Sequence, residues 1–238
     1  MEQFMTPAFW IAVGQIIMID ILLGGDNAVV IALACRKLSP QHRTKGILWG
    51  TAGAIALRVI LIFFALTLLA IPYLKLVGAA LLVWIGIKLL APDDDDHGDI
   101  QASDKLLSAI KTIIVADLVM SIDNVIAIAG AAESAGGDHK MPLVIFGLLV
   151  SIPIIVWGSQ LVIKLMDRFP VIVTLGGMLL GWIAGTMAVT DPAVKDYLAQ
   201  AVPLGASTLS YVAGAAGALL VYAVGLMVKQ RRQTAGAD

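Results

Sequence analysis

Two short stretches of this sequence place the same acidic and amide side chains, at the same spacing, inside long apolar runs. Each stretch has an aspartate, a second aspartate six residues later and an asparagine directly after it. The six residues are Asp20, Asp26, Asn27, Asp117, Asp123 and Asn124. The two stretches align without gaps, and the offset from Asp20 to Asp117 is 97 residues. Such a match indicates an internal repeat with a polar site in each copy.

Carboxylate and amide oxygens are the only ligand atoms that these side chains offer, and no His or Cys lies near them. Oxygen ligands suit Mg²⁺, Ca²⁺ and Mn²⁺ and do not suit Zn²⁺ or Cu⁺. On a helix, Asp20 and Asn27 lie nearly on one face, with Asp26 about a third of a turn away. The four negative charges fit a divalent cation better than Na⁺ or an anion. The six residues therefore predict a divalent cation site, with the cation as substrate and no prosthetic group.

The composition is that of a membrane protein. Hydrophobic residues make up 59% of the chain and charged residues 14%, against about 45–50% and about 25% in soluble domains. A charged residue at the bilayer centre costs about 2.5–3.5 kcal/mol, so aspartates in apolar helices indicate function. The net charge of −1 implies no attraction to nucleic acid. The first apolar run follows no basic residue, so we predict a retained helix and not a cleaved signal peptide.

Seven segments are long and apolar enough to be predicted as membrane-spanning helices. They are residues 8–34, 46–71, 73–91, 106–132, 142–164, 171–190 and 208–228. Of the 16 Lys and Arg residues, twelve fall in or beside alternate connections, three on the other side, and Arg58 within a span. By the positive-inside rule this predicts an inner (plasma) membrane protein with its N-terminus outside and its C-terminus in the cytoplasm.

The motif repeat extends into the following spans, so three helices appear twice. Because three is odd, the second copy is inverted in the membrane, as in secondary transporters that bind substrate between the repeats. The predicted fold is all-α, with two inverted three-helix repeats and one extra helix. Its parts are residues 1–91 (first repeat), 92–105 (acidic cytoplasmic loop), 106–190 (second repeat) and 191–238 (seventh helix and basic tail).

Three features have two interpretations each. Gly24 and Gly25 either loosen the first helix and free carbonyl oxygens or allow close helix contact. Arg58 either pairs with an aspartate or gates the path, or it makes a purely structural ion pair. The acidic run Asp93–Asp96 either gathers cations or is a solvated linker.

The paired motifs, in seven spans of this order, resemble the TerC family of integral membrane proteins. The form Leu-Gly-Gly-Asp-Asn-Ala-Val-Val, which ends at Val30, resembles its YjbE-type branch, within the wider LysE-type transporter superfamily. The resemblance covers nearly the whole chain and implies manganese export, with the six motif residues as cation ligands. Many members of the family have Glu at the first acidic position and Ser in place of Gly24.

The sequence therefore predicts a divalent cation exporter, foremost for Mn²⁺, that works by alternating access with protons as the coupling ion. It would act as a monomer or homodimer among membrane lipids. One alternative is a membrane partner that delivers Mn²⁺ to other proteins, and another is a Ca²⁺ transporter. An intramembrane aspartyl enzyme fits least, because Leu23 stands where the Gly-x-Gly-Asp pattern requires glycine. We predict no enzyme activity, and the absence of a Walker-type motif gives no indication of direct ATP use.

Overall fold

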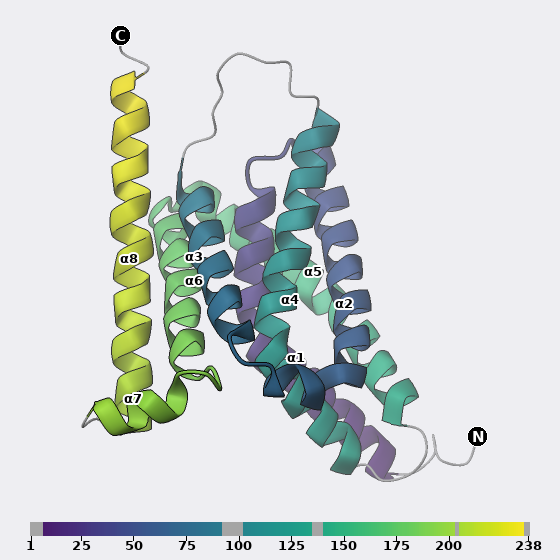
Figure 1. The fold of residues 1–238 in the computed structure, drawn as a ribbon. Helices are drawn as coiled ribbons and strands as arrows, with labels where there is room; N and C mark the ends of the chain where they lie inside the picture. The colour runs from purple at the N-terminus through teal and green to yellow at the C-terminus, as the bar shows by residue number, and fades with distance from the viewer. Residues whose placement is uncertain (1–6, 92–101, 135–139, 203–204, 236–238) are drawn as a thin grey trace.

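The computed structural model describes residues 7–91, 102–134, 140–202 and 205–235, and within these ranges its regular structure is all helical. The helices are α1 (Pro7–Cys35), α2 (Pro40–Ala70), α3 (Leu74–Leu90), α4 (Ala102–Ser134), α5 (Lys140–Arg168), α6 (Val171–Val189), α7 (Lys195–Ala201) and α8 (Ala206–Ala235) (Figure 1). The predicted all-α class is confirmed. The acidic run Asp93–Asp96 lies outside the described residues.

Proline sets several of the helix boundaries. α2 begins at Pro40, because proline's fixed φ suits the first helical turn and its missing N–H is not needed there. It ends at Ala70, because the backbone of the next residue, Ile71, is extended before Pro72. α2 and α4 start four to six residues before the predicted spans 46–71 and 106–132, since helical hydrogen bonds continue into polar flanks. The short α7, across the lower end of Figure 1, was not predicted.

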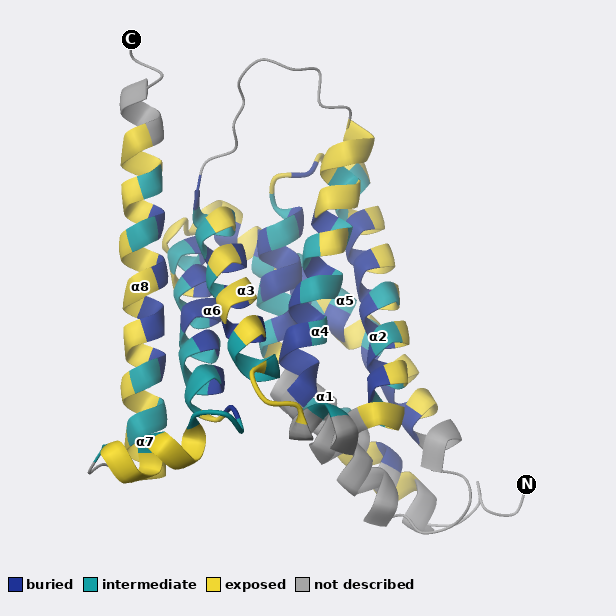
Figure 2. Cartoon of the chain, in the orientation of Figure 1, coloured by how far each residue is buried: buried dark blue, intermediate teal, exposed yellow. Residues whose placement is uncertain are grey.

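The surface of the bundle is apolar and part of its interior is polar, the reverse of a soluble protein. Trp49, Phe63 and Trp157 are each 67–68% exposed, whereas Arg58 and Asp117 are buried. Figure 2 shows the same division, with buried faces turned inward and exposed faces outward. Such a surface is stable in lipid and not in water. The chain is an integral membrane protein.

Four described segments are long and apolar enough to cross a membrane. They are Pro40–Phe64, Val144–Arg168, Val171–Val189 and Ala206–Arg231. They belong to α2, α5, α6 and α8. A shorter apolar segment, Gly25–Cys35, forms the second half of α1.

The helices pack in a regular order. α2 lies along α4, α1 against α5, and α3 against α6, while α1 and α4 also touch each other. α8 packs against α6 and α3 at one side of the molecule (Figure 1). The four helices α1, α2, α4 and α5 therefore surround a common interior.

Contacts between loops bring one set of connections together at one end of the bundle and another set at the opposite end. At one end, Arg36 and Lys37 donate to the carbonyl oxygens of Leu89 (3.2 Å) and Ala91 (3.0 Å). There too, Arg43 pairs with Asp167 at the end of α5, at 3.1 Å. At the other end, the turn before α3 bonds to the connection after α6. The first, third and fifth connections thus share one end.

Candidate cation site

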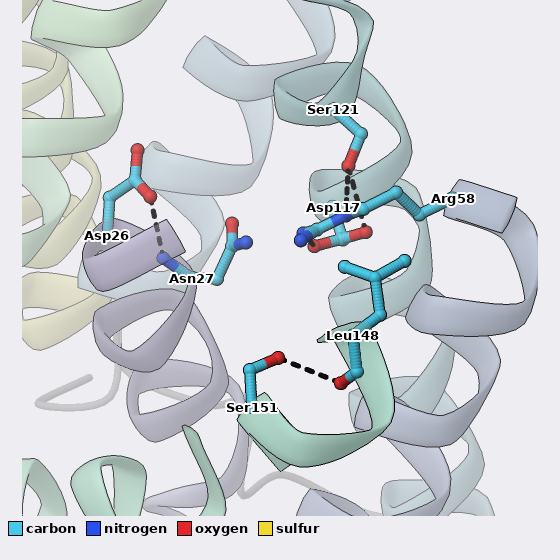
Figure 3. A network of polar contacts seen from close by, with 7 residues as sticks. All are labelled: Asp26, Asn27, Arg58, Asp117, Ser121, Leu148 and Ser151. Atoms are coloured by element: carbon cyan, nitrogen blue, oxygen red, sulfur yellow. Dashed lines mark hydrogen bonds and ion pairs between the residues drawn. The ribbon is translucent and has the colours of Figure 1, made fainter. Parts of the chain in front are cut away.

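A buried polar network joins α2 to α4 in the interior of the bundle. Arg58 donates from Nη2 to Oδ1 of Asp117 and from Nε to Oγ of Ser121, the latter at 3.0 Å. Ser121 in turn donates to Oδ2 of Asp117 at 3.1 Å (Figure 3). Relative exposures are 2% for Arg58, 6% for Asp117 and zero for Ser121. Arg58 therefore pairs with an aspartate, Asp117, and both a functional and a purely structural ion pair agree with this contact.

The first motif faces this network from α1. Asp26 accepts a hydrogen bond from the backbone N–H of Asn27 at 2.9 Å. It also lies near enough to Asp117 and Arg58 for their charges to act on it. In Figure 3 the side chain of Asn27 points across the interior toward Arg58 and Asp117. The structure therefore brings part of the first motif opposite part of the second.

Asn27 stands out because its buried side chain is left unsatisfied. It is 4% exposed, and within the described part of the chain neither its Nδ2 nor its Oδ1 has a hydrogen-bond partner. Leaving a buried polar group unpaired costs about 1–3 kcal/mol, and such a group in a folded protein calls for a functional explanation. An amide oxygen beside a carboxylate is a suitable ligand for a hard cation.

A fourth helix reaches the same interior. Ser151 of α5 is fully buried, and its hydroxyl donates to the carbonyl oxygen of Leu148 at 2.8 Å. Figure 3 places Ser151 beneath Asn27 and Asp117. Side chains from α1, α2, α4 and α5 thus line one polar interior between apolar helices.

The remaining predicted ligands are described less fully. Asp20 and Asp123 lie within α1 and α4, but their side chains are outside the described residues. Asn124 is half-buried on α4. Among the side chains that are described, no three of His, Cys, Asp and Glu gather at one point. The six-residue cation cluster thus stays a prediction, of which the structure brings Asp26, Asn27 and Asp117 toward one interior.

The structure shows no unwinding of the helix at the glycine pair and no close helix contact at Gly25. α1 runs without a break past Gly24 and Gly25, so the helix is not unwound there. A Cβ placed on Gly25 would meet no atom within 4 Å, so Gly25 is not a helix-contact glycine.

Ser121 was missed by the sequence prediction although a signal was present. It aligns with Gly24 in the repeat and follows Asp117 by four residues, so the two side chains share one helix face.

The comparison with known families supplies the identity that the motifs suggested. The sequence pattern of the family described as "Integral membrane protein TerC family" matches residues 5–233. This chain belongs to the TerC family of integral membrane proteins. The predicted resemblance is confirmed, since the TerC match spans both motifs.

Several known membrane proteins are similar to this TerC chain along most of its length. It is 41% identical over 196 residues to the uncharacterized membrane protein YjbE of Bacillus subtilis, covering 82% of this chain and 87% of the relative. It is 22% identical over 245 residues to YceF of the same organism, covering 99% and 91%. The UPF0053 inner membrane protein YgdQ of Escherichia coli is 23% identical over 181 residues, covering 69% and 74%. No solved structure matches this TerC chain significantly.

Proposed function

We propose that this TerC-family protein is a transporter that exports divalent cations from the cytoplasm, with Mn²⁺ as its foremost substrate. The observation that carries the proposal is Asn27, a buried amide with no hydrogen-bond partner among the described residues, beside Asp26 and facing Asp117. Oxygen donors from both motif copies thereby converge in the interior of an apolar bundle. This arrangement suits a hard divalent cation that both copies would hold, with Asp20, Asp123 and Asn124 completing the ligands.

The pattern of helix contacts supports an inverted repeat with seven spans. Exchanging α1, α2 and α3 for α4, α5 and α6 turns the α1–α5 contact into the α4–α2 contact, and both are extensive. The same exchange maps the α1–α4 and α3–α6 contacts onto themselves. A pseudo-two-fold axis in the membrane plane has this effect, and transporters built so bind substrate at the repeat interface. α8 is the extra helix.

The orientation and the coupling follow from charge. The basic first connection lies at the same end as the last residues of α3 and α5, and we assign this end to the cytoplasmic face of the inner membrane. When the cation leaves, crowded carboxylates in a low-dielectric interior are stabilised by taking up protons. Exchange of Mn²⁺ for protons is therefore the coupling that we propose.

The first test is Mn²⁺ flux into proteoliposomes across an imposed pH gradient. The wild type is compared with Asp26→Asn and Asp123→Asn, which remove one charge from each motif copy. We expect both variants to insert in the membrane and to lose flux, because each removes a cation ligand. Asp104→Asn is a matched control, since Asp104 is exposed in the first turn of α4, and its flux should equal that of the wild type.

The alternatives give different results in the same assay. Normal flux in both Asn variants would show that the motif is not the site. A wild type that binds Mn²⁺ but moves none would instead be a membrane partner that delivers the metal. Ca²⁺ that competes better than Mn²⁺ and is itself moved would identify a calcium transporter.

A further inference from the structure

Arg58 places a fixed positive charge inside the interior where the proposed substrate, also a cation, would bind. Its guanidinium lies against Asp117, and in Figure 3 it is on the side that faces Asn27. Arginine keeps its charge at every physiological pH. The side chain is 2% exposed. One of the carboxylates assigned to the substrate is therefore already neutralised by the protein itself.

This internal cation is present in only one of the two repeats. The repeat offset of 97 residues aligns Arg58 with Ile155, a buried apolar residue of α5. Asp117 of α4 thus has an arginine on the helix that packs against it, whereas the equivalent position of the other repeat has none. The two halves of the site have related side chains, but within the described residues only one half has a positive charge beside its first aspartate.

A buried carboxylate and guanidinium attract each other strongly, because the effective dielectric constant is low, and removal of one leaves the other uncompensated. A divalent cation that binds Asp117 must therefore replace Arg58 as its partner. The cation can bind only the fraction of protein in which Asp117 is not paired with Arg58. The apparent Kd is the intrinsic Kd divided by that fraction, so a small fraction weakens the apparent affinity. Conversely, Arg58 returning to Asp117 assists the release of the cation.

We infer that Arg58 is a tethered counter-cation that occupies Asp117 when no substrate is bound and is displaced from it by the incoming divalent cation. The inference rests on the proposed function, which supplies the substrate. It assigns Arg58 a role in setting affinity and release, while the ligands themselves remain the acidic and amide side chains. Arg58 then competes with the cation for Asp117 and is not itself a ligand of the cation.

The test is Mn²⁺ binding to the purified full-length protein in lipid nanodiscs, measured by titration. Arg58→Gln removes the competitor, so its apparent Kd should fall about tenfold or more below that of the wild type. Arg58→Lys keeps a tethered charge and should stay near the wild-type value. Arg43→Gln is the matched control, because it makes the same substitution in the Arg43–Asp167 pair outside the interior, and its Kd should not change.

Thermal unfolding supplies a second measurement that a purely structural ion pair would not reproduce. Without metal, Arg58→Gln should unfold at a lower temperature, because the buried carboxyl group of Asp117 loses its guanidinium partner. Mn²⁺ should raise its unfolding temperature more than that of the wild type. The double variant Arg58→Gln/Asp117→Asn should regain stability without metal and lose the tightened binding. If Arg58→Gln fails to accumulate in the membrane, Mn²⁺ in the medium should restore it.

Two results would overturn this inference alone, provided that the wild type binds Mn²⁺. One is an Arg58→Gln variant that binds Mn²⁺ no more tightly than the wild type. The other is an Arg58→Gln variant that fails to accumulate and is not restored by Mn²⁺. Absence of binding of Mn²⁺, Mg²⁺ and Ca²⁺ in the wild type and every variant would overturn the proposed function as well. The two failures are therefore distinguishable.

Discussion

At the scale of single residues, the two motif copies differ in whether their buried polar groups are satisfied within the described part of the chain. Arg58 shares hydrogen bonds with Asp117 and Ser121, whereas the amide of Asn27 has none among the described residues. A fully satisfied buried network stabilises a fold, and a partly satisfied one costs stability. A residue retained at such a cost is expected to contribute to function more than to folding.

We therefore predict that Asn27→Leu stabilises the protein and impairs transport. Leucine has the same branching at Cγ but no polar atoms to leave unpaired, so the free energy of unfolding should rise by about 1–3 kcal/mol. Mn²⁺ flux should fall at least about tenfold, which corresponds to about 1.4 kcal/mol of lost interaction. Thermal unfolding in detergent and the proteoliposome assay measure the two effects.

Thr51→Val serves as the control for this prediction. Thr51 of α2 is also buried, and its hydroxyl has no partner among the described residues, yet it belongs to neither motif. Its replacement should stabilise the protein without loss of flux. A destabilised Asn27→Leu protein would indicate that the Asn27 amide is hydrogen-bonded in the membrane, and the argument for a ligand role would fail.

At the scale of helices, Asp191 connects the first half of the chain to the second. The first N–H groups of a helix have no partner within it, and the side chain of Tyr73, the N-cap residue of α3, does not accept a hydrogen bond from them. Asp191 accepts instead from the backbone N–H groups of Tyr73 (2.9 Å), Lys75 (3.0 Å) and Leu76 (3.2 Å). Ala193 adds a fourth donor at 2.7 Å. The backbone of Tyr73 is left-handed, with a φ of 67°, and these bonds hold the turn in place.

The ionised form of Asp191 is the one that makes this connection. Burial by itself raises the pKa of its carboxyl, but the four backbone donors outweigh burial and hold the pKa below its ordinary value. A negative charge is also favourable at the N-terminus of α3. The folded protein therefore binds a proton at Asp191 less readily than the unfolded chain does.

Asp191→Asn should lower the free energy of unfolding by about 2–3 kcal/mol, because bonds to a charged acceptor are the stronger ones. It should also increase hydrogen exchange at the first turn of α3. The difference in the free energy of unfolding between the variant and the wild type should be complete above the unfolded pKa of about 3.9. It should disappear as the pH falls through the lower pKa of Asp191 in the folded protein. Asp196→Asn, in the exposed first turn of α7, should show neither effect. Equal stability at pH 7 would contradict a clamping role.

At the scale of the whole molecule, α8 is attached to the rest of the bundle by backbone contact with α6. A Cβ on Gly181 would collide with the carbonyl oxygen of Gly217, and one on Gly185 with that of Ala213. Backbone atoms cannot move aside as a flexible side chain can. Small residues at helix interfaces are typical of membrane proteins, where close van der Waals packing drives association.

Gly185→Ala should therefore separate α8 from α6 and lower the free energy of unfolding by about 1–3 kcal/mol, the usual cost of overpacking. Thermal unfolding and hydrogen exchange along α8 would measure the change. Gly14→Ala is the matched control, since a Cβ there meets no atom within 4 Å. If Gly185→Ala were as stable as Gly14→Ala, the close contact would not be what holds α8.

The sequence by itself determined the membrane class, the helical segments and the paired motifs. A long apolar run in lipid must satisfy its own backbone hydrogen bonds, so its length and composition are enough to predict a helix. The repeat of Asp20, Asp26 and Asn27 at Asp117, Asp123 and Asn124 is visible without any structure. The short α7 was missed because its seven residues are not apolar enough to be noticed as a helix.

Only the tertiary structure decided which polar groups meet. Arg58 and Asp117 lie 59 residues apart in sequence, and Asp191 and Tyr73 lie 118 residues apart. The unsatisfied amide of Asn27 was likewise beyond prediction, since it depends on whether any neighbouring helix supplies a hydrogen-bond partner. The physical reason is that these helices are apolar nearly all round, and a helix without a distinct polar face does not indicate in its sequence which side meets which neighbour.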